Sequence, residues 1–301
     1  MIAESDGRAD SGFVLVAVLW ILAALATLAS IYSVYALNTV NGSHVADDRV
    51  QAEASIRAGV EMAVFRQLTV PEKVRPSHGS FNLRVGRTSV AVDFRSEAAR
   101  IDLNAAPSDL LAGLFVAVGV DPTRAGTFAD RVIGWRTKAT VNTASKEAKL
   151  YADARIPYPP RQAPFDNALE LSLLPGLPKP VVERVLPFVT VFSGKSAVDV
   201  ASADPTVLSA LPGMTPQILN AFLKARASDP GDGRALLELL GPAKSHASTD
   251  RSKTVRAAVA VAFDNGRRVD AEVVFRLKDS GDEPYDLLYW RDDFDGPMQS
   301  G

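Results

Sequence analysis

An uninterrupted apolar segment near the amino terminus limits what this 301-residue chain can fold into more than any other feature. From Phe13 to Ile31 it reads FVLVAVLWILAALATLASI, and no Asp, Glu, Lys or Arg occurs from residue 11 to 46. About 20 helical residues cross the hydrocarbon core of a bilayer, whereas the apolar part of a signal peptide needs only about 7–15. We therefore predict a membrane-spanning helix. A buried core helix and a signal peptide cut after Ala24-Leu25-Ala26 are the alternatives.

The charges on the two sides of this segment do not fix its orientation. One arginine, Arg8, precedes it among three acidic residues, and one arginine, Arg49, follows two. The positive-inside rule counts Lys and Arg near the ends of a span, and here the count is equal on both sides. Orientation has to come from other evidence.

Composition argues against several classes of function. The formal net charge is −2, so no global positive field attracts nucleic acid. The chain has no cysteine, which excludes disulfides, thiolate nucleophiles and cysteine-ligated zinc. Its three histidines are not at metal-ligand spacing, and the sequence has no nucleophile motif, paired acid–base site or phosphate loop. We predict a protein that is not an enzyme and has no cofactor.

After the span, an amphipathic pattern predicts that the helix continues as one layer of a soluble domain. Asn41-Gly42-Ser43 is the place where this helix would fray or bend, and Pro71 should end it. The apolar residues recur at three- and four-residue steps, at Ala54, Ala58, Met62, Phe65 and Leu68.

Alternating apolar and polar residues predict an antiparallel sheet built from two separated blocks. Because the sheet blocks are far apart in sequence, the region between them should be an insertion, which gives an α+β fold. The expected elements are a hairpin of 81–85 and 89–94 around Gly86-Arg87, a hairpin of 256–263 and 269–276 around Asp264-Asn265-Gly266-Arg267, and a last strand over 285–290.

The middle region, about residues 101–240, is helical in pattern and repeats itself. The segment Ile101–Leu111 is echoed by Val198–Leu208, each with an extended entry, a proline at the first helical turn and an apolar helical face. Leu174-Pro175-Gly176-Leu177 and Leu211-Pro212-Gly213-Met214 match helix-hairpin-helix turns, in which glycine permits a tight chain reversal.

Helix-hairpin-helix turns suggest an alternative function, a membrane-anchored nucleic-acid-binding protein, because backbone amides at such turns can hold a phosphate. The cations near the first turn, Lys179 and Arg184, are offset by Glu183, and the second turn has none until Lys224 and Arg226. Phosphate neutralisation needs a basic stripe, which the sequence lacks. We therefore interpret the turns as packing devices and expect no nucleic-acid partner.

The start of the chain resembles the processing site of type IV pilins and pseudopilins, with a short polar leader that ends in Gly12 and is followed by Phe13 and the apolar run. The resemblance implies cleavage after Gly12 by a membrane aspartyl peptidase, methylation of the new amino terminus, and a periplasmic mature domain. Most members carry Glu at the fifth mature position, which here is Ala17. Minor pseudopilin K of type II secretion is the subunit known for this omission, and it is placed at the filament tip.

Later blocks also resemble the minor pseudopilin K family, in which an all-helical domain is inserted into the pilin sheet. The resemblance implies a pilin-like long N-terminal helix packed on an antiparallel sheet, with an inserted helix-hairpin-helix or SAM-like domain. The matching blocks are Arg100–Ala106, Ile133–Arg136, Pro164–Asn167 leading to Glu170-Leu171, Leu174-Pro175-Gly176 and Phe188–Val191.

The chain departs from this family after Trp135, where members usually carry an acidic run associated with calcium. Calcium prefers six to eight oxygen ligands, but Thr137–Asn142 supplies a lysine instead. We therefore predict no metal site. The remaining acidic residues of the region are scattered, at Asp130, Glu147, Asp153 and Asp166.

The resemblance implies a single-pass inner-membrane protein with a periplasmic soluble domain, which nucleates the secretion pseudopilus at its tip. The implied partners are the I- and J-type minor pseudopilins, the major pseudopilin filament and the prepilin peptidase. We expect a leader over 1–12, the transmembrane part of the helix over 13–37, the soluble half of the helix and the first hairpin over 38–100, the helical insert over 101–245 and the last strands over 246–301.

Overall fold

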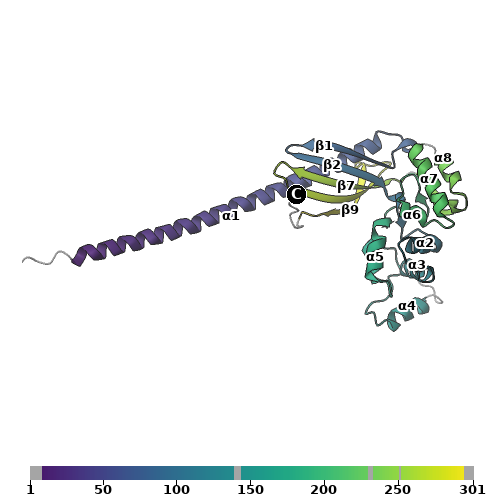
Figure 1. The fold of residues 1–301 in the computed structure, drawn as a ribbon, viewed down its shortest axis with the longest axis horizontal. Coiled ribbons are helices and arrows are strands. Elements are labelled where there is room, and N and C mark those ends of the chain that lie inside the picture. Colours follow the sequence, from purple (N-terminus) through teal and green to yellow (C-terminus); the bar gives the residue numbers. More distant parts are fainter. Residues whose placement is uncertain (1–8, 139–143, 230–232, 251, 295–301) are drawn as a thin grey trace, which may run out of the picture. The chain divides into compact units, whose positions relative to one another are not determined.

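The computed structural model describes residues 9–138, 144–229, 233–250 and 252–294 (Figure 1). The chain divides into two compact units, with the boundary after Ser55. One continuous helix, α1 (Ala9–Leu68), runs through this boundary. Helical structure continues through residues 41–43, where we expected fraying, because a lone glycine inside a helix costs only about 1 kcal/mol. The helix stops before Pro71, as predicted.

The amino-terminal unit carries the predicted span. In the described part of the chain, Phe13–Ser33 is the one helical segment that is long and apolar enough to cross a membrane, with a mean hydropathy of 2.6 over 21 residues. None of it is buried inside the protein, which removes the alternative of a buried core helix. The segment fits a single-pass membrane anchor by length and composition. A signal peptide near an amino terminus passes the same test.

The second unit contains a five-stranded antiparallel sheet in the order β1-β2-β7-β8-β9. Both hairpins and the last strand are confirmed. The pairing of β2 with β7 sets Val92 opposite Val259, so strands far apart in sequence are neighbours and the region between them is an insertion. The strands are β1 (His78–Val85), β2 (Thr88–Ser96), β7 (Thr254–Phe263), β8 (Arg268–Leu277) and β9 (Tyr285–Asp292).

The face of α1 that packs on the sheet is not the one we predicted. Ile56 and Val60 are buried, and a Cβ added at Gly59 would meet the side chains of Val92 and Val259 at 3.0–3.3 Å, so the helix backbone lies close to the sheet. Ala54, Met62, Phe65 and Leu68 of the predicted row are exposed, and Ala58 is half-buried. The helix has apolar residues on two faces, and periodicity alone did not tell which one the sheet covers.

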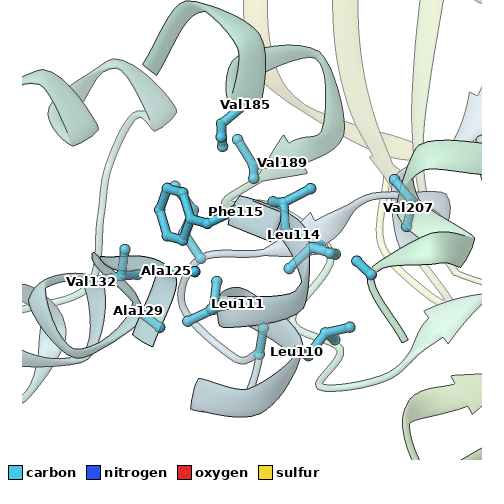
Figure 2. Close-up of a cluster of buried hydrophobic side chains, with 14 of the residues drawn as sticks. Leu110, Leu111, Leu114, Phe115, Ala125, Ala129, Val132, Val185, Val189 and Val207 are labelled. Atoms are coloured by element: carbon cyan, nitrogen blue, oxygen red, sulfur yellow. The ribbon is translucent and has the colours of Figure 1, made fainter. Parts of the chain in front are cut away.

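The insert is mostly helical and has its own apolar core. Leu110, Leu111, Leu114 and Phe115 of one helix pack with residues of the next helix and of more distant segments (Figure 2). The helices are α2 (Ser108–Ala117), α3 (Pro122–Arg136), α4 (Ala144–Asp153), α5 (Lys179–Val185), α6 (Pro205–Ser209), α7 (Pro216–Ser228) and α8 (Gly233–Leu239). Short 3-10 helices are η1 (Glu72–Val74) and η2 (Glu97–Ala99) before the insert, and η3 (Ala168–Leu173), η4 (Leu186–Phe188) and η5 (Gly241–His246) within it.

The insert is not entirely helical, because the extended entry of each echo pairs with a distant segment. The strand β3 (Ile101–Asp102) pairs in parallel with β4 (Val189–Thr190), and β5 (Val198–Asp199) pairs in parallel with β6 (Ala247–Ser248). Pro107 directly precedes α2 and Pro205 begins α6, close to the predicted positions. The internal repeat is therefore present in three dimensions as two strand–helix–helix units.

In each repeat, the second residue of the short strand is a buried aspartate that fixes the neighbouring backbone by hydrogen bonds. Asp102 accepts hydrogen bonds from the amides of Asn104 and Gly194, at 2.7 Å each. Asp199 accepts hydrogen bonds from the amide of Ala201 at 3.1 Å and the hydroxyl of Ser202 at 2.7 Å. Both carboxylates thus satisfy donors in the turn between strand and helix, and Asp102 also binds the segment that follows β4.

Each repeat also has an arginine in the last turn of its second helix, which reaches back to the turn between its strand and its first helix. Arg136, the last residue of α3, donates to the carbonyl oxygens of Leu103 and Ala106, and Arg226 of α7 donates to those of Val200 and Ala203. Burial lowers the pKa of both guanidinium groups, which nevertheless stay charged at neutral pH. These two arginines lock the second helix of each repeat onto the turn before the first.

Candidate functional site

The residues singled out for processing and for position in the filament all lie on α1. Phe13 is exposed and Ala17 is half-buried. Gly12 precedes Phe13 within the helix, and residues 1–8 of the expected leader lie outside the described residues. Cleavage after Gly12 and a tip position marked by Ala17 stay predictions.

An exposed apolar row on the carboxyl-terminal part of α1 is a candidate surface for packing against another protein. It comprises Met62, Phe65 and Leu68, whose exposed fractions are 37%, 61% and 39%. The row is on the same helix as the apolar span. Large apolar side chains that are grouped on one helical face commonly mark a site of association. Arg66, next to Phe65, instead covers the ring of Phe81 at 4.2 Å.

The same helix segment is fixed within the second unit by two side chains one and two turns before Phe65. Tyr285 of β9 donates a hydrogen bond of 2.7 Å to Glu61. Burial and this hydrogen bond raise the pKa of Tyr285 to about 12. The guanidinium of Arg57 lies over the ring of Trp290 at 5.8 Å. The exposed row is therefore presented by a helix segment that polar and ring contacts hold in place.

The acidic residues considered for calcium do not converge. Asp130 lies 3.5 Å from the hydroxyl of Ser108, and Glu147 forms an ion pair with Arg131 at 3.4 Å. Asp153 is exposed. Within the described ranges, no group of three or more His, Asp or Glu residues is arranged to hold a metal ion. Residues 139–142, which replace the acidic run, lie outside those ranges.

The fourth of these acids, Asp166, faces a cation that the chain itself supplies. The guanidinium of Arg161 contacts Asp166 through one nitrogen and Glu170 through another, the latter at 3.0 Å. The second oxygen of Glu170 accepts a hydrogen bond of 2.9 Å from the indole of Trp135. Arg161 therefore bridges the two carboxylates and offsets one of their two negative charges.

Metal independence can be tested directly. We expect that EDTA does not change the melting midpoint of the full-length chain in detergent, whereas Arg161→Ala lowers it because Asp166 and Glu170 lose their shared cation. Arg87→Ala serves as the matched control, since its side chain is 89% exposed and contacts Asp264 only at 3.7 Å. A large drop in midpoint on chelation would show that a metal site exists.

Two of the four cations beside the helix-hairpin-helix turns, Arg226 and Lys179, contact groups of the fold itself. Arg226 donates hydrogen bonds to the carbonyl oxygens of Val200 and Ala203 in its own repeat, and Lys179 lies 3.8 Å from Glu183. Gly176 and Gly213 have φ of 73° and 82°, as tight reversals require. The turns are confirmed, but these contacts give the nucleic-acid alternative no support.

Sequence reasoning missed an ion-pair cluster between the sheet and the insert. Glu97 of η2 is buried and accepts two hydrogen bonds from Arg256 of β7, at 2.6 and 3.1 Å. The hydroxyl of Thr190 in β4 also donates to Glu97. Arg256 further pairs with Glu272 of β8 at 2.8 Å. No local pattern marks these residues, because 159 positions separate Glu97 from Arg256.

Comparisons with known proteins agree with this architecture. The family described as type II secretion system (T2SS), protein K, matches residues 79–194. A crystal structure of the GspK-GspI-GspJ complex from the type 2 secretion system of enterotoxigenic Escherichia coli contains a chain with the same fold. The TM-score is 0.59 at 16% identity, over 82% of this chain and 97% of that chain. A search of curated proteins found no match.

Proposed function

We propose that this chain, whose residues 79–194 belong to the type II secretion protein K family and whose fold is that of a minor pseudopilin K, is a non-enzymatic tip subunit of the secretion pseudopilus. In this role it would nucleate assembly of the filament that moves proteins across the outer membrane. The partners that fit are I- and J-type minor pseudopilins, because the matching solved chain belongs to a GspK-GspI-GspJ complex.

The observation that carries this proposal is α1 itself. A membrane-length apolar segment, Phe13–Ser33, continues without interruption into the helix that packs on the sheet and exposes Met62, Phe65 and Leu68. Such a helix can anchor the subunit in the inner membrane and offer neighbouring subunits an apolar face beyond the span. The soluble domain would then face the periplasm, and the major pseudopilin filament would continue beneath the tip.

The proposed role requires processing by the prepilin peptidase. We predict cleavage between Gly12 and Phe13, where the charged leader meets the apolar run, followed by methylation of the new amino terminus. Mass spectrometry of the mature protein from cells that contain the peptidase measures this, and cells without the peptidase provide the control. A terminus that begins after Ala26 would instead indicate a signal peptide and would remove the anchor.

The tip position makes a prediction about Ala17. An ionised carboxylate at this depth costs about 2.5–3.5 kcal/mol by insertion scales unless a neighbour's amine pairs with it. A tip subunit has no subunit above it to supply that amine, so Ala17→Glu should impair filament assembly and secretion without unfolding the soluble domain. Ala17→Leu, which stays apolar, should be tolerated.

Secretion assays at matched protein levels would measure both variants. Unimpaired or improved assembly of Ala17→Glu would count against the tip position, because a subunit within the filament shaft would have a subunit above it whose amine could pair with the new carboxylate. The melting behaviour of the two variants should match that of the unmodified chain, since Ala17 lies in the amino-terminal unit and outside the folded core.

A further inference from the structure

A cavity of about 350 Å³ lies where the insert meets the sheet, and it is rich in arginine. Arg100 before the insert, Arg256 of β7 and Arg291 of β9 line it, together with one carboxylate, Glu272. Because side chains alternate along a strand, Arg256 and Val259 lie on opposite faces of β7. The cavity is therefore on the sheet face opposite α1, which packs near Val259.

The charges around this cavity do not balance. Arg256 is paired with Glu97 and Glu272, and Arg291 contacts the second oxygen of Glu272 at 3.5 Å. Three arginines and two glutamates leave one positive charge in excess. The lining also includes Asn167 but no further Asp, Glu, Lys or His.

The excess charge belongs to Arg100. In the part of the chain that the structure describes, no hydrogen-bond or ion-pair partner contacts its guanidinium. Burial, and next the repulsion from Arg256, lower the pKa of Arg100 and outweigh the longer-range attraction of Glu97 and Glu272, although Arg100 stays protonated at neutral pH. A partly desolvated guanidinium with unused donors is unfavourable on its own, and an anion in the cavity would relieve this cost.

The remaining wall restricts which anion fits. Leu169, Leu186 and Val191 line the cavity beside Phe192 and Tyr289, whose ring centroids are 6.3 Å apart. A fully hydrated inorganic ion would leave these apolar and aromatic groups uncovered. A carboxylate attached to an apolar group would satisfy the guanidinium and cover the wall at the same time.

We propose that this cavity is a binding site for an apolar carboxylate, with Arg100 as the principal anchor of the carboxylate group. Arg291, which has only one long contact to Glu272, can turn toward the same group. The ligand chemistry is shared by a free organic acid and by the carboxyl end of a peptide. The site is separate from the exposed row on α1 and does not depend on the assembly function.

The test uses the full-length chain in detergent micelles and three probes observed by saturation-transfer NMR. N-acetyl-phenylalanine should bind with a dissociation constant on the order of 1 mM, as expected for a ligand of this size. N-acetyl-phenylalaninamide, which lacks the carboxylate, should bind at least tenfold more weakly. A tripeptide that ends in phenylalanine distinguishes a peptide ligand from a free organic acid. Tighter binding of the tripeptide than of N-acetyl-phenylalanine indicates that the site takes the carboxyl end of a peptide. Equal binding indicates a free acid.

Variants connect binding to the proposed residue. Arg100→Gln should weaken binding of N-acetyl-phenylalanine at least tenfold, and Arg100→Lys should weaken it less because the charge remains. Arg268→Gln is the matched control, since Arg268 is exposed and is not part of the cavity wall. Equal binding of acid and amide, or of Arg100→Gln and the unmodified chain, would overturn the proposal. The acid–amide comparison needs no variant and stays decisive if Arg100→Gln fails to fold.

Discussion

Gly113→Ala should lower the free energy of unfolding of the second unit by about 2–3 kcal/mol, because added methyl groups in a tight core typically cost about 1–3 kcal/mol. Gly113 lies inside α2, where the backbone passes very close to the end of α6. A Cβ at this position would meet the carbonyl oxygen of Ala210 at 2.0 Å and its carbonyl carbon at 2.9 Å. These are backbone atoms, so a rotamer change cannot relieve the clash and one helix has to move.

The same substitution at Gly126 is the matched control. Gly126 lies inside α3, and a Cβ there would meet nothing within 4 Å. Alanine is favoured over glycine in a helix interior by about 0.5–1 kcal/mol, so Gly126→Ala should leave stability unchanged or raise it slightly. Chemical denaturation of the full-length chain measures both changes. Equal effects of the two substitutions would show that α2 and α6 are not in this close contact.

Glu97→Gln should lower the free energy of unfolding by about 3 kcal/mol. Removing one partner of a buried ion pair costs about 3–5 kcal/mol, and the lower end applies because Arg256 keeps its second partner, Glu272. The side chain of Glu97 is 1% exposed, and it joins the hydroxyl of Thr190 in the insert to Arg256 in the sheet. Glutamine keeps the shape but removes the charge. At roughly 2–4 °C per kcal/mol, the melting midpoint should fall by about 6–12 °C.

Glu183→Gln provides the comparison for an exposed ion pair. Lys179 and Glu183 are 3.8 Å apart, with side chains 85% and 61% exposed, so the change should stay within about 0.5 kcal/mol. If Glu97→Gln had an equally small effect, the cluster would not join the insert to the sheet.

Because of the same cluster, the free energy of unfolding should depend on pH. Burial alone would raise the pKa of Glu272, but Arg256 outweighs this and the pKa is lowered from its usual 4.5. A depressed pKa means that the folded state favours the ionised form of Glu272. The stability that ionised Glu272 contributes is therefore complete above about pH 4.5 and is lost as the pH falls further.

Local patterns predicted the parts of the fold that local physics determines. The hairpin at Gly86-Arg87 and the one at Asn265-Gly266 follow from alternation and from glycines with positive φ, which are 56° and 86°. The echo of Ile101–Leu111 in Val198–Leu208 predicted the two repeats of the insert. Our prediction of the buried face of α1 was wrong for a different reason. Both faces are apolar, and only the position of the sheet determines which one is covered.

Contacts between distant segments could not be predicted in this way. Three such contacts join positions that are 88 or more residues apart. They are the parallel pairing of Ile101 with Val189, the close approach of Gly113 to Ala210, and the hydrogen bonds from Arg256 to Glu97. The acidic position in each entry, Asp102 and Asp199, was visible in the echo as a shared residue. Its role as a buried acceptor became clear only when the donors were placed around it.

The proposed function as a minor pseudopilin beside I- and J-type subunits can be tested most directly by the composition of the complex that this chain forms. The chain should be produced together with the I- and J-type pseudopilins of the same organism, extracted in detergent and purified through a tag on this chain alone. We expect native mass spectrometry to show a complex that contains one copy of each of the three proteins. Recovery of a correctly folded chain without either partner would contradict it.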